Sequence, residues 1–413
     1  MSPKSSEENL YKSLFDSYEK FKELKLKSDF IRHCELTALK EYLTTTGNLS
    51  VESIGKSVEN REITAYTIGE GPIKILAWSQ MHGDEPTATA AIFDIIRFFQ
   101  PSELFNDFRT KLLKKITVHF IPMLNPDGAE KYQRENIFNI DLNRDAVRRQ
   151  SDESQILWSY AEKVAPDFGF NLHDQNSYYT AGNFNNPSAI SLLAPPMNHV
   201  KSINYVREKS MQVICKIAET LSMFIPNKIA RYTDDFEPRS FGDNFVKKGI
   251  SAILIESGFH RDDPNKNFVR KLNYLALLCA FNNIADESYS DIDHKKYFDL
   301  PENQELLLDL ILRNLSLVYN GRKFTIDVGI KREKQLETQT GKFYYKSKIA
   351  ELGDLTTFYG IEEYDLQGME LISGSYLEVE GPANFSILKA GKLEMQILNG
   401  FILEQDHSNS NIN

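Results

Sequence analysis

The pattern of hydrophobic and polar residues predicts an α/β domain with a mixed central sheet flanked by helices. Short apolar runs typical of buried strands lie at residues 73–78, 116–123, 168–172, 189–193 and 251–255. Apolar residues at helical spacing fill several of the intervals, most clearly at 87–99, 198–224 and 268–284. Apolar strands that alternate with helical segments in this way are typical of α/β domains.

The pattern changes toward the C-terminus, where alternating strands and glycine-containing turns replace the helices. We therefore expect a helical N-terminal lead-in at 1–50, an α/β domain at 51–295 and a small β-rich C-terminal domain at 315–405. The charged stretch 285–301 predicts a linker, and the periodicity of 303–317 predicts a helix. Residues 44–50 are expected to form a loop, and the polar residues 405–413 are expected to fray.

The composition argues against several classes of protein: nucleic-acid-binding, membrane-spanning and disulfide-rich proteins. A formal net charge of −10 provides no basic footprint for nucleic acid, and no window reaches the roughly 18 apolar residues of a membrane span. The N-terminal residues lack the apolar core of a signal peptide. The three cysteines, Cys34, Cys215 and Cys279, are widely spaced and odd in number, which argues against a disulfide framework. We therefore expect a cytoplasmic protein that binds neither nucleic acid nor membrane.

Polar residues with metal-binding chemistry follow three of the predicted strands. His82 and Glu85 stand in a tight loop after 73–78, His173 follows 168–172, and Glu256 follows 251–255. Because ligands bind outside the carboxyl ends of strands in open α/β sheets, we expect these residues to converge at one edge. Two histidines and a glutamate form a catalytic type of zinc site, which keeps a fourth position open. A further carboxylate beside such a site can act as a general base.

A loop after the second strand adds positive charge and amide groups. It contains Arg134, Asp141, Asn143 and Arg144. Arginine grips a carboxylate through two parallel N–H bonds, and asparagine can donate a further bond. A second arginine near a metal can stabilise the oxyanion that forms when a carbonyl is attacked. The loop therefore predicts recognition of a substrate carboxylate.

Together these motifs resemble those of the zinc carboxypeptidase family, the relatives of carboxypeptidases A and D. The resemblance rests on His-Gly-Asp-Glu at 82–85, Asn-Pro-Asp-Gly at 125–128, Asp-Leu-Asn-Arg at 141–144, His173 and Glu256, in the family's order over about residues 50–290. It identifies the chain as a bacterial-type member with an added C-terminal domain. It implies one zinc ion per chain.

The resemblance also implies a role for each site residue. The zinc would be held by His82, Glu85 and His173, and Glu256 would be the general base. Asn143 and Arg144 would hold the terminal carboxylate of the substrate, and Arg134 would stabilise the oxyanion.

Part of the family pattern is altered around the specificity pocket. Tyr232 is the nearest candidate for the tyrosine that closes over the substrate, although its local sequence differs from that of the animal enzymes. Phe241 and Asp243 both fall near the pocket, and they predict opposite preferences, one apolar and one basic.

The expected function is that of a metallocarboxypeptidase, a zinc hydrolase that cleaves an amide bond next to a free carboxylate of a peptide. Two hydrolase alternatives share the metal set and the Asn-Arg pair: a deacylase of N-acyl amino acids and a murein-peptide amidase. A third alternative is an inactive relative that binds ligands or proteins through its C-terminal domain. The complete set of predicted ligands and base argues against that third alternative.

Overall fold

The computed structural model describes residues 3–43, 49–372 and 376–403. Contacts divide the chain into two compact units, Met1–Gln304 and Glu305–Asn413. The predicted loop at 44–50 lies outside the described residues except for its last two, and the predicted tail at 405–413 lies entirely outside them. Across the described ranges, no helix combines the length and the hydropathy needed to cross a membrane.

The first unit is built on a mixed sheet of eight strands in the order β1-β2-β4-β3-β5-β9-β7-β8. The central strands β4, β3, β5 and β9 are parallel, whereas β7 runs antiparallel to β9 and the edge strands β1 and β2 pair antiparallel. The strands are β1 Ser50–Lys56, β2 Glu62–Gly69, β3 Ile73–Trp78, β4 Ile116–Ile121, β5 Phe168–Asp174, β7 Ile190–Leu193, β8 Ile229–Arg231 and β9 Ser251–Ser257. The predicted mixed α/β fold is confirmed.

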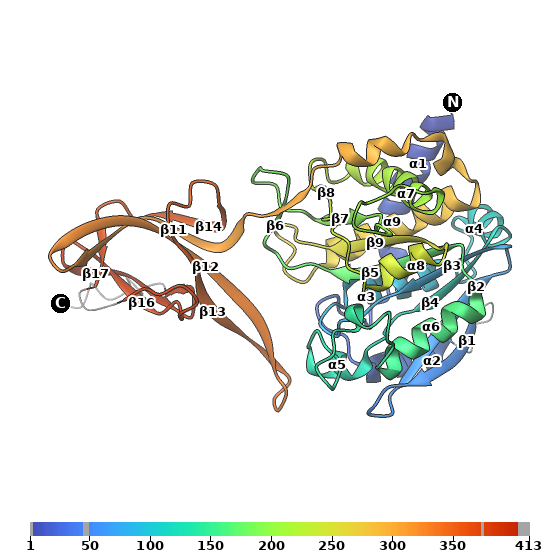
Figure 1. Cartoon of the computed structure of the whole chain (residues 1–413), viewed down its shortest axis with the longest axis horizontal. Helices are drawn as coiled ribbons and strands as arrows, with labels where there is room; N and C mark the ends of the chain where they lie inside the picture. The colour runs from blue at the N-terminus through green and yellow to red at the C-terminus, as the bar shows by residue number, and fades with distance from the viewer. Residues whose placement is uncertain (1–2, 44–48, 373–375, 404–413) are drawn as a thin grey trace. The chain divides into compact units, whose positions relative to one another are not determined.

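Helices cover both faces of this sheet (Figure 1). Alternate side chains of a strand point to opposite faces, so an apolar strand needs cover on both. In β3, Ile75 and Ala77 pack into the apolar cluster that includes α3, α7 and α9. Leu76 and Trp78 point the other way and pack with α6 and α8. The α-helices are α1 Pro3–Asp16, α2 His33–Leu43, α3 Thr87–Phe98, α4 Asn106–Leu113, α5 Pro126–Lys131, α6 Asp152–Val164, α7 Tyr205–Ser222, α8 Phe241–Lys247 and α9 Asn267–Ala285.

Shorter elements complete the first unit. They are the 3₁₀ turns η1 Tyr18–Lys20, η2 Leu142–Arg144, η3 Ser288–Asp291 and η4 His294–Asp299, and a two-stranded sheet of β6 Tyr179–Ala181 and β10 Asn303–Glu305. The stretch 285–301, predicted as a linker, belongs to this unit because η3 and η4 bury Tyr289 and Tyr297 in its core.

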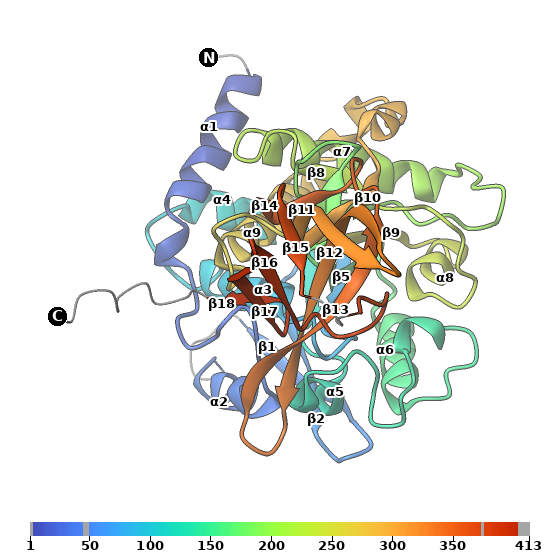
Figure 2. The ribbon, with the colours of Figure 1, turned by 90° about the vertical axis from the view of Figure 1, so that its left-hand side faces the viewer.

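A buried ion pair fastens the N-terminal segment to the core. Arg270 Nε donates to Asp94 Oδ2 at 2.7 Å, and neither side chain is exposed. The same guanidinium donates to the carbonyl oxygens of Leu26 and Glu23, each at 2.8 Å, and Tyr18 donates its hydroxyl to Asp94 at 2.8 Å. Residues 18–26 therefore contribute to one packed unit, in which α1 lies at the outside (Figure 2).

The second unit is rich in β-strands. Its main sheet has the order β13-β12-β11-β15-β16-β17-β18, and β14 also pairs with β11. The strands are β11 Leu307–Tyr319, β12 Arg322–Glu337, β13 Lys342–Gly353, β14 Tyr359–Asp365, β15 Met369–Leu371, β16 Phe385–Lys389, β17 Lys392–Leu398 and β18 Phe401–Leu403. Strands β12 and β13 form a long hairpin that extends beyond the other strands of this unit (Figure 1).

The helix predicted at 303–317 is wrong, because most of this segment forms strand β11. Leu310, Leu312 and Leu315 pack into one apolar cluster of the unit, whereas Leu308 and Ile311 pack into another. A strand that is buried on both faces has a nearly continuous apolar run, which imitates the periodicity of a buried helix.

Candidate active site

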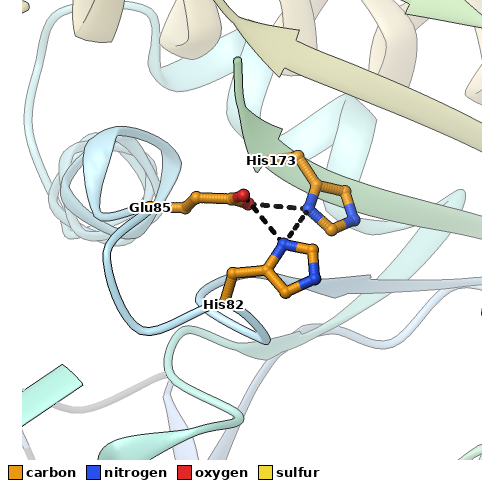
Figure 3. A group of neighbouring side chains, drawn as sticks. All are labelled: His82, Glu85 and His173. Atoms are coloured by element: carbon orange, nitrogen blue, oxygen red, sulfur yellow. Dashed lines mark hydrogen bonds and ion pairs between the residues drawn. The ribbon is translucent and has the colours of Figure 1, made fainter. Parts of the chain in front are cut away.

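The three predicted zinc ligands lie together beyond the carboxyl ends of β3 and β5. His82 and Glu85 stand in the loop between β3 and α3, and His173 is the penultimate residue of β5. His82 Nδ1 lies 2.8 Å from Glu85 Oε1, His173 Nδ1 lies 2.7 Å from Glu85 Oε2, and the two Nδ1 atoms are 3.2 Å apart. The side chains point toward one another (Figure 3).

These donor atoms fit a zinc ion. Zinc binds histidine nitrogen at about 2.0–2.1 Å in a tetrahedral shell, which places donors about 3.3 Å apart. The distance of 3.2 Å between the two Nδ1 atoms meets this requirement. Each Glu85 oxygen lies closer than this to an imidazole nitrogen, because it is hydrogen-bonded to that nitrogen directly. The three residues are buried and their ligand atoms lie within 4.8 Å of one another; within the described part of the chain no other such group of His, Cys, Asp or Glu occurs.

The charges of this cluster favour a bound cation. Burial lowers the pKa of His82, but the Glu85 and Asp141 carboxylates outweigh it and raise that pKa to about 9. Burial opposes ionisation of Glu85, yet His82 and His173 hold its pKa well below the usual value. Burial lowers the pKa of His173. A zinc ion requires neutral imidazoles, so its binding would release the His82 proton and replace it by a stronger positive charge.

Close backbone packing holds the metal-binding loop. A Cβ atom on Gly83 would lie 2.1 Å from the carbonyl carbon of Gly128, so only glycine permits this approach. Asn125 accepts a bond from the Gly128 N–H at 2.9 Å and donates its own amide to Met81 O at 3.2 Å. The His-Gly-Asp-Glu and Asn-Pro-Asp-Gly motifs thus form one packed unit, and Pro86 leads into helix α3.

Asp141 and Arg134 lie beside the predicted ligand cluster and contact it. Asp141 Oδ1 lies 3.0 Å from His82 Nε2, so it accepts the ring proton and turns Nδ1 toward the metal position. Arg134 donates to Asp141 Oδ2 at 3.1 Å and to Glu85 Oε1 at 3.2 Å, and its side chain is 41% exposed. The predicted oxyanion-stabilising arginine therefore stands at the edge of the ligand cluster, with part of its guanidinium open to solvent.

Glu256, the predicted general base, stands one strand from His173. The parallel register of β5 and β9 pairs these two residues directly. Glu256 is 7% exposed, and burial raises the pKa of its carboxyl group to about 8, with a further contribution from the Glu85 charge. A nearby dication would oppose both effects and favour the carboxylate that a general base requires.

Asn143 and Arg144 lie in the 3₁₀ turn η2, which Asp141 caps by accepting from the Asn143 N–H at 2.8 Å. Asn143 Oδ1 accepts from Phe241 N at 3.0 Å, which orients its amide so that the NH₂ group is the side available to a ligand. Arg144 donates to Asn143 O at 2.9 Å and pairs with Glu237 at 3.2 Å, and 38% of its side chain is exposed.

One cavity of about 450 Å³ joins these residues. Its lining includes every residue that the sequence predicted for the site: His82, Glu85, Arg134, Asn143, Arg144, His173, Tyr232 and Glu256. Tyr232 lies beside Tyr179, with ring centroids 6.3 Å apart, and burial raises the pKa of its hydroxyl.

The two residues predicted near the specificity pocket have different positions. Asp243 lines the cavity. Phe241 does not, since it is fully buried in the core below α8, where its ring centroid lies 5.9 Å from that of Trp158. The apolar preference suggested by Phe241 therefore has no structural basis.

Sequence reasoning missed several polar residues in and around the cavity, among them Asn171 and Lys266. Asn171 lines the cavity from β5, two residues before His173 and hence on the same face of the strand. That spacing could have indicated it. Lys266 contacts Asp174 at 3.2 Å, just behind His173. No feature of the local sequence around Lys266 indicates this position.

Comparison with known proteins shows similarity to one family over part of the chain. Residues 37–209 match the sequence model of the family described as zinc carboxypeptidase. The chain is 27% identical over 144 residues to carboxypeptidase SOL1 of Arabidopsis thaliana, covering 33% of this chain and 29% of that protein. It is 32% identical over 112 residues to carboxypeptidase M of Mus musculus, covering 23% and 25% respectively.

A longer match extends beyond these regions. The protein named Probable carboxypeptidase 2 of Arthroderma benhamiae is 26% identical over 273 residues, which cover 63% of this chain and 46% of that protein. The chain thus spans between a quarter and about half of the length of these three relatives.

Solved structures share the fold. The metallo-carboxypeptidase from Burkholderia cenocepacia aligns with a TM-score of 0.51 and 16% identity, covering 63% of this chain and 70% of that one. The resemblance inferred from the motifs is thus confirmed, and the His-Glu-His cluster agrees with the metal that the family's description names. On these grounds residues 37–209 resemble a zinc carboxypeptidase domain, and the first unit of the chain shares the fold of the solved metallo-carboxypeptidase.

Proposed function

We propose that this protein is a zinc-dependent metallocarboxypeptidase that hydrolyses the peptide bond preceding a free C-terminal carboxylate. The observation that carries the proposal is the shared cavity. It brings a His-Glu-His metal cluster, a buried glutamate and an Asn-Arg pair into one space of about 450 Å³. Metal-assisted hydrolysis of a C-terminal peptide bond uses such components side by side: a metal, a general base and a group that binds the free carboxylate.

Each component has a distinct role. Asn143 and Arg144 bind the terminal carboxylate, Asn143 through its NH₂ group and Arg144 through the exposed part of its guanidinium. This contact places the last peptide bond beside the metal cluster. Glu256 takes a proton from the attacking water and returns it to the leaving amine. Arg134 donates to the carbonyl oxygen as negative charge develops there.

Zinc held by His82, Glu85 and His173 would supply Lewis-acid chemistry, since it lowers the pKa of water and polarises a carbonyl group. Asp141 supports this function by fixing the orientation of the His82 ring.

The decisive test compares matched substrates on the purified, zinc-loaded protein. The panel contains blocked dipeptides with a free C-terminal carboxylate, the same dipeptides as C-terminal amides, N-acetyl amino acids and a murein-type peptide. We expect cleavage of the free-carboxylate dipeptides alone. We also expect Glu256→Gln to retain one zinc per chain, measured by metal analysis, and to lose hydrolysis.

Three results would contradict the proposal. Equal cleavage of the amides would remove the carboxylate-binding role of Asn143 and Arg144. Cleavage restricted to N-acetyl amino acids or to the murein peptide would assign the site to one of those amidases. Full turnover by Glu256→Gln would exclude Glu256 as the base.

A further inference from the structure

A carboxylate of the protein itself contacts the arginine that is proposed to hold the substrate. Glu237 lines the cavity, and its Oε2 atom lies 3.2 Å from Nε of Arg144. A guanidinium grips a carboxylate most firmly when two parallel N–H groups on one edge donate to it, and the Nε–H group belongs to such an edge. Glu237 therefore takes a donor that the terminal carboxylate of a substrate would use.

Backbone bonds hold Glu237 at this position. Ser240 donates its backbone N–H to Glu237 O at 2.9 Å, and Ala146 donates its N–H to the carbonyl oxygen of Arg239 at 3.0 Å. Because Ala146 lies two residues after Arg144, the second bond ties the segment that carries Glu237 to the segment that carries this arginine. The fold thus keeps the two side chains within reach of each other.

A second arginine holds the same carboxylate. Arg239 donates from Nε to Glu237 Oε1 at 2.9 Å and from Nη2 to Glu237 Oε2 at 3.0 Å. This hydrogen bonding lowers the pKa of Glu237, and the Arg144 charge adds to the effect, so the group is a carboxylate at neutral pH. If another carboxylate takes Arg144, Glu237 keeps its bonds to Arg239. The contact with Arg144 can therefore be broken without leaving Glu237 uncompensated.

Arg144 has an anchor that does not depend on Glu237. Its Nη1 donates to the carbonyl oxygen of Asn143 at 2.9 Å, within the turn η2. Removal of the Glu237 charge leaves this bond in place and frees the Nε–H group. The contact with Glu237 is therefore better explained by competition for Arg144 than by orientation of it.

We propose that Glu237 is an internal competitor for the substrate carboxylate: it pairs with Arg144 in the free protein and remains with Arg239 alone when a substrate binds. This inference rests on the proposed carboxypeptidase function, in which Arg144 binds the terminal carboxylate. A ligand has to supply a carboxylate of its own to replace Glu237, whereas a C-terminal amide leaves the pair intact. Glu237 thus weakens the binding of every free-carboxylate substrate and compensates the Arg144 charge in the empty site.

The test measures the binding of a blocked dipeptide with a free C-terminal carboxylate and of the same dipeptide as an amide. Calorimetry on zinc-loaded Glu256→Gln, with and without Glu237→Gln, gives dissociation constants without turnover. The side chains of Glu237 and Arg144 are 28% and 38% exposed, so their pair has the strength of a partly exposed one. We expect Glu237→Gln to lower the dissociation constant of the free-carboxylate dipeptide about two- to fivefold and to leave that of the amide unchanged. In the otherwise wild-type enzyme, Glu237→Gln should lower KM by the same factor at constant kcat.

Arg239→Gln gives a second readout of opposite sign. The displaced Glu237 then loses the cation that retains it, so the dissociation constant of the free-carboxylate dipeptide should rise about two- to fivefold. In the double variant with Glu237→Gln, no carboxylate has to be displaced and this rise should disappear. Glu162→Gln is the matched control, because Glu162 pairs with Arg149 at 3.3 Å and neither residue lines the cavity. It should change neither dissociation constant.

The outcomes separate this inference from the proposed function. A dissociation constant that stays the same or rises in Glu237→Gln overturns the competitor, as does an equal gain for the amide, while cleavage of free-carboxylate dipeptides by the wild type leaves the carboxypeptidase function standing. Tighter binding of the free carboxylate by Glu237→Gln supports the competitor even if the wild type hydrolyses no dipeptide. Binding without preference for the free carboxylate, with and without Glu237→Gln, overturns both.

Discussion

Lys266 links the segments that carry the predicted metal ligands and the predicted base. Its Nζ donates to Asp174 Oδ2 at 3.2 Å, to Ser257 O at 3.1 Å and to Gln175 O at 3.4 Å. Asp174 directly follows His173, and Ser257 directly follows the predicted base. One ammonium group therefore fixes the ends of both β5 and β9.

The carboxylate of Asp174 extends this link to the third segment. It accepts the hydroxyl of Thr87, two residues after Glu85, and the Asp174 N–H donates to Glu85 Oε2 at 3.2 Å. Burial raises the pKa of Asp174, and the Lys266 charge opposes that rise. Loss of Lys266 would leave this carboxylate buried without its cation, next to the predicted zinc ligand His173.

We predict that Lys266→Met destabilises the protein and weakens zinc binding. Removal of one partner from a buried ion pair costs about 3–5 kcal/mol. The Asp174 side chain is 8% exposed and that of Lys266 is 26% exposed, so water can replace part of the contact. We therefore expect the lower end of the range, about 3 kcal/mol. Groups that orient metal ligands contribute about 10- to 100-fold in affinity, so the zinc dissociation constant should rise at least tenfold.

Denaturant unfolding of the metal-free protein and competition with a chromophoric chelator measure the two effects. Lys40→Met is the control, since Lys40 pairs with Glu62 and is also 26% exposed, but lines no part of the cavity. The Glu62 side chain is 34% exposed, whereas that of Asp174 is 8% exposed, so the Lys40–Glu62 pair contributes at most about 1 kcal/mol and should not affect zinc binding. If Lys266→Met changed stability and zinc affinity no more than Lys40→Met does, the linking role would be refuted.

Three further predictions concern single side chains. Asp141→Asn should raise the zinc dissociation constant about tenfold, measured by chelator competition, because it weakens the bond that orients His82. Burial raises the pKa of Asp243 from 3.8 to about 6. Between these pH values the folded state binds more protons than the unfolded state, so the wild-type free energy of unfolding falls as the pH rises from about 4 to about 6. In denaturant unfolding, Asp243→Asn should thus be more stable than wild type at pH 7.5, by up to about 3 kcal/mol, and lose this advantage at pH 4; equal gains at both pH values would contradict the assignment. Arg270→Met should cost about 3–5 kcal/mol in unfolding free energy by leaving Asp94 buried and unpaired, and a change below about 1 kcal/mol would contradict this.

The convergence of the predicted metal ligands and the predicted base could be inferred from the sequence because it depends on a simple rule. His82, His173 and Glu256 each follow an apolar run, and the carboxyl ends of parallel strands meet at one edge. The observed strand order places β3, β5 and β9 side by side, which brings the three residues together. Strand order itself is set by long-range packing, so the distances between the ligands could not be predicted.

Features that depend on three-dimensional contacts were harder to predict. Asp141 was recognised as part of a motif, but its bond to His82 depends on the path of the loop around η2. The rotation of helix α8 about its axis determines whether Phe241 or Asp243 faces the cavity. That rotation is fixed by the Ser240 cap and by the packing of Phe241 on Trp158. Strand β11 was mistaken for a helix because burial on both faces removes the alternation that distinguishes a strand.

The charges around the metal cluster connect zinc binding with the acid–base role of Glu256. Burial raises the pKa of Asp84 to about 6, that of Asp174 above its usual value and that of Glu256 to about 8, and in each case the Glu85 charge adds to the effect. The His82 and Arg134 charges lower the pKa of Glu256 but do not offset this rise. A dication held by the cluster would favour ionisation of all these carboxylates. Under the proposed function, a bound zinc ion would thus serve twice: it would polarise the substrate carbonyl and favour the carboxylate form of Glu256 at neutral pH.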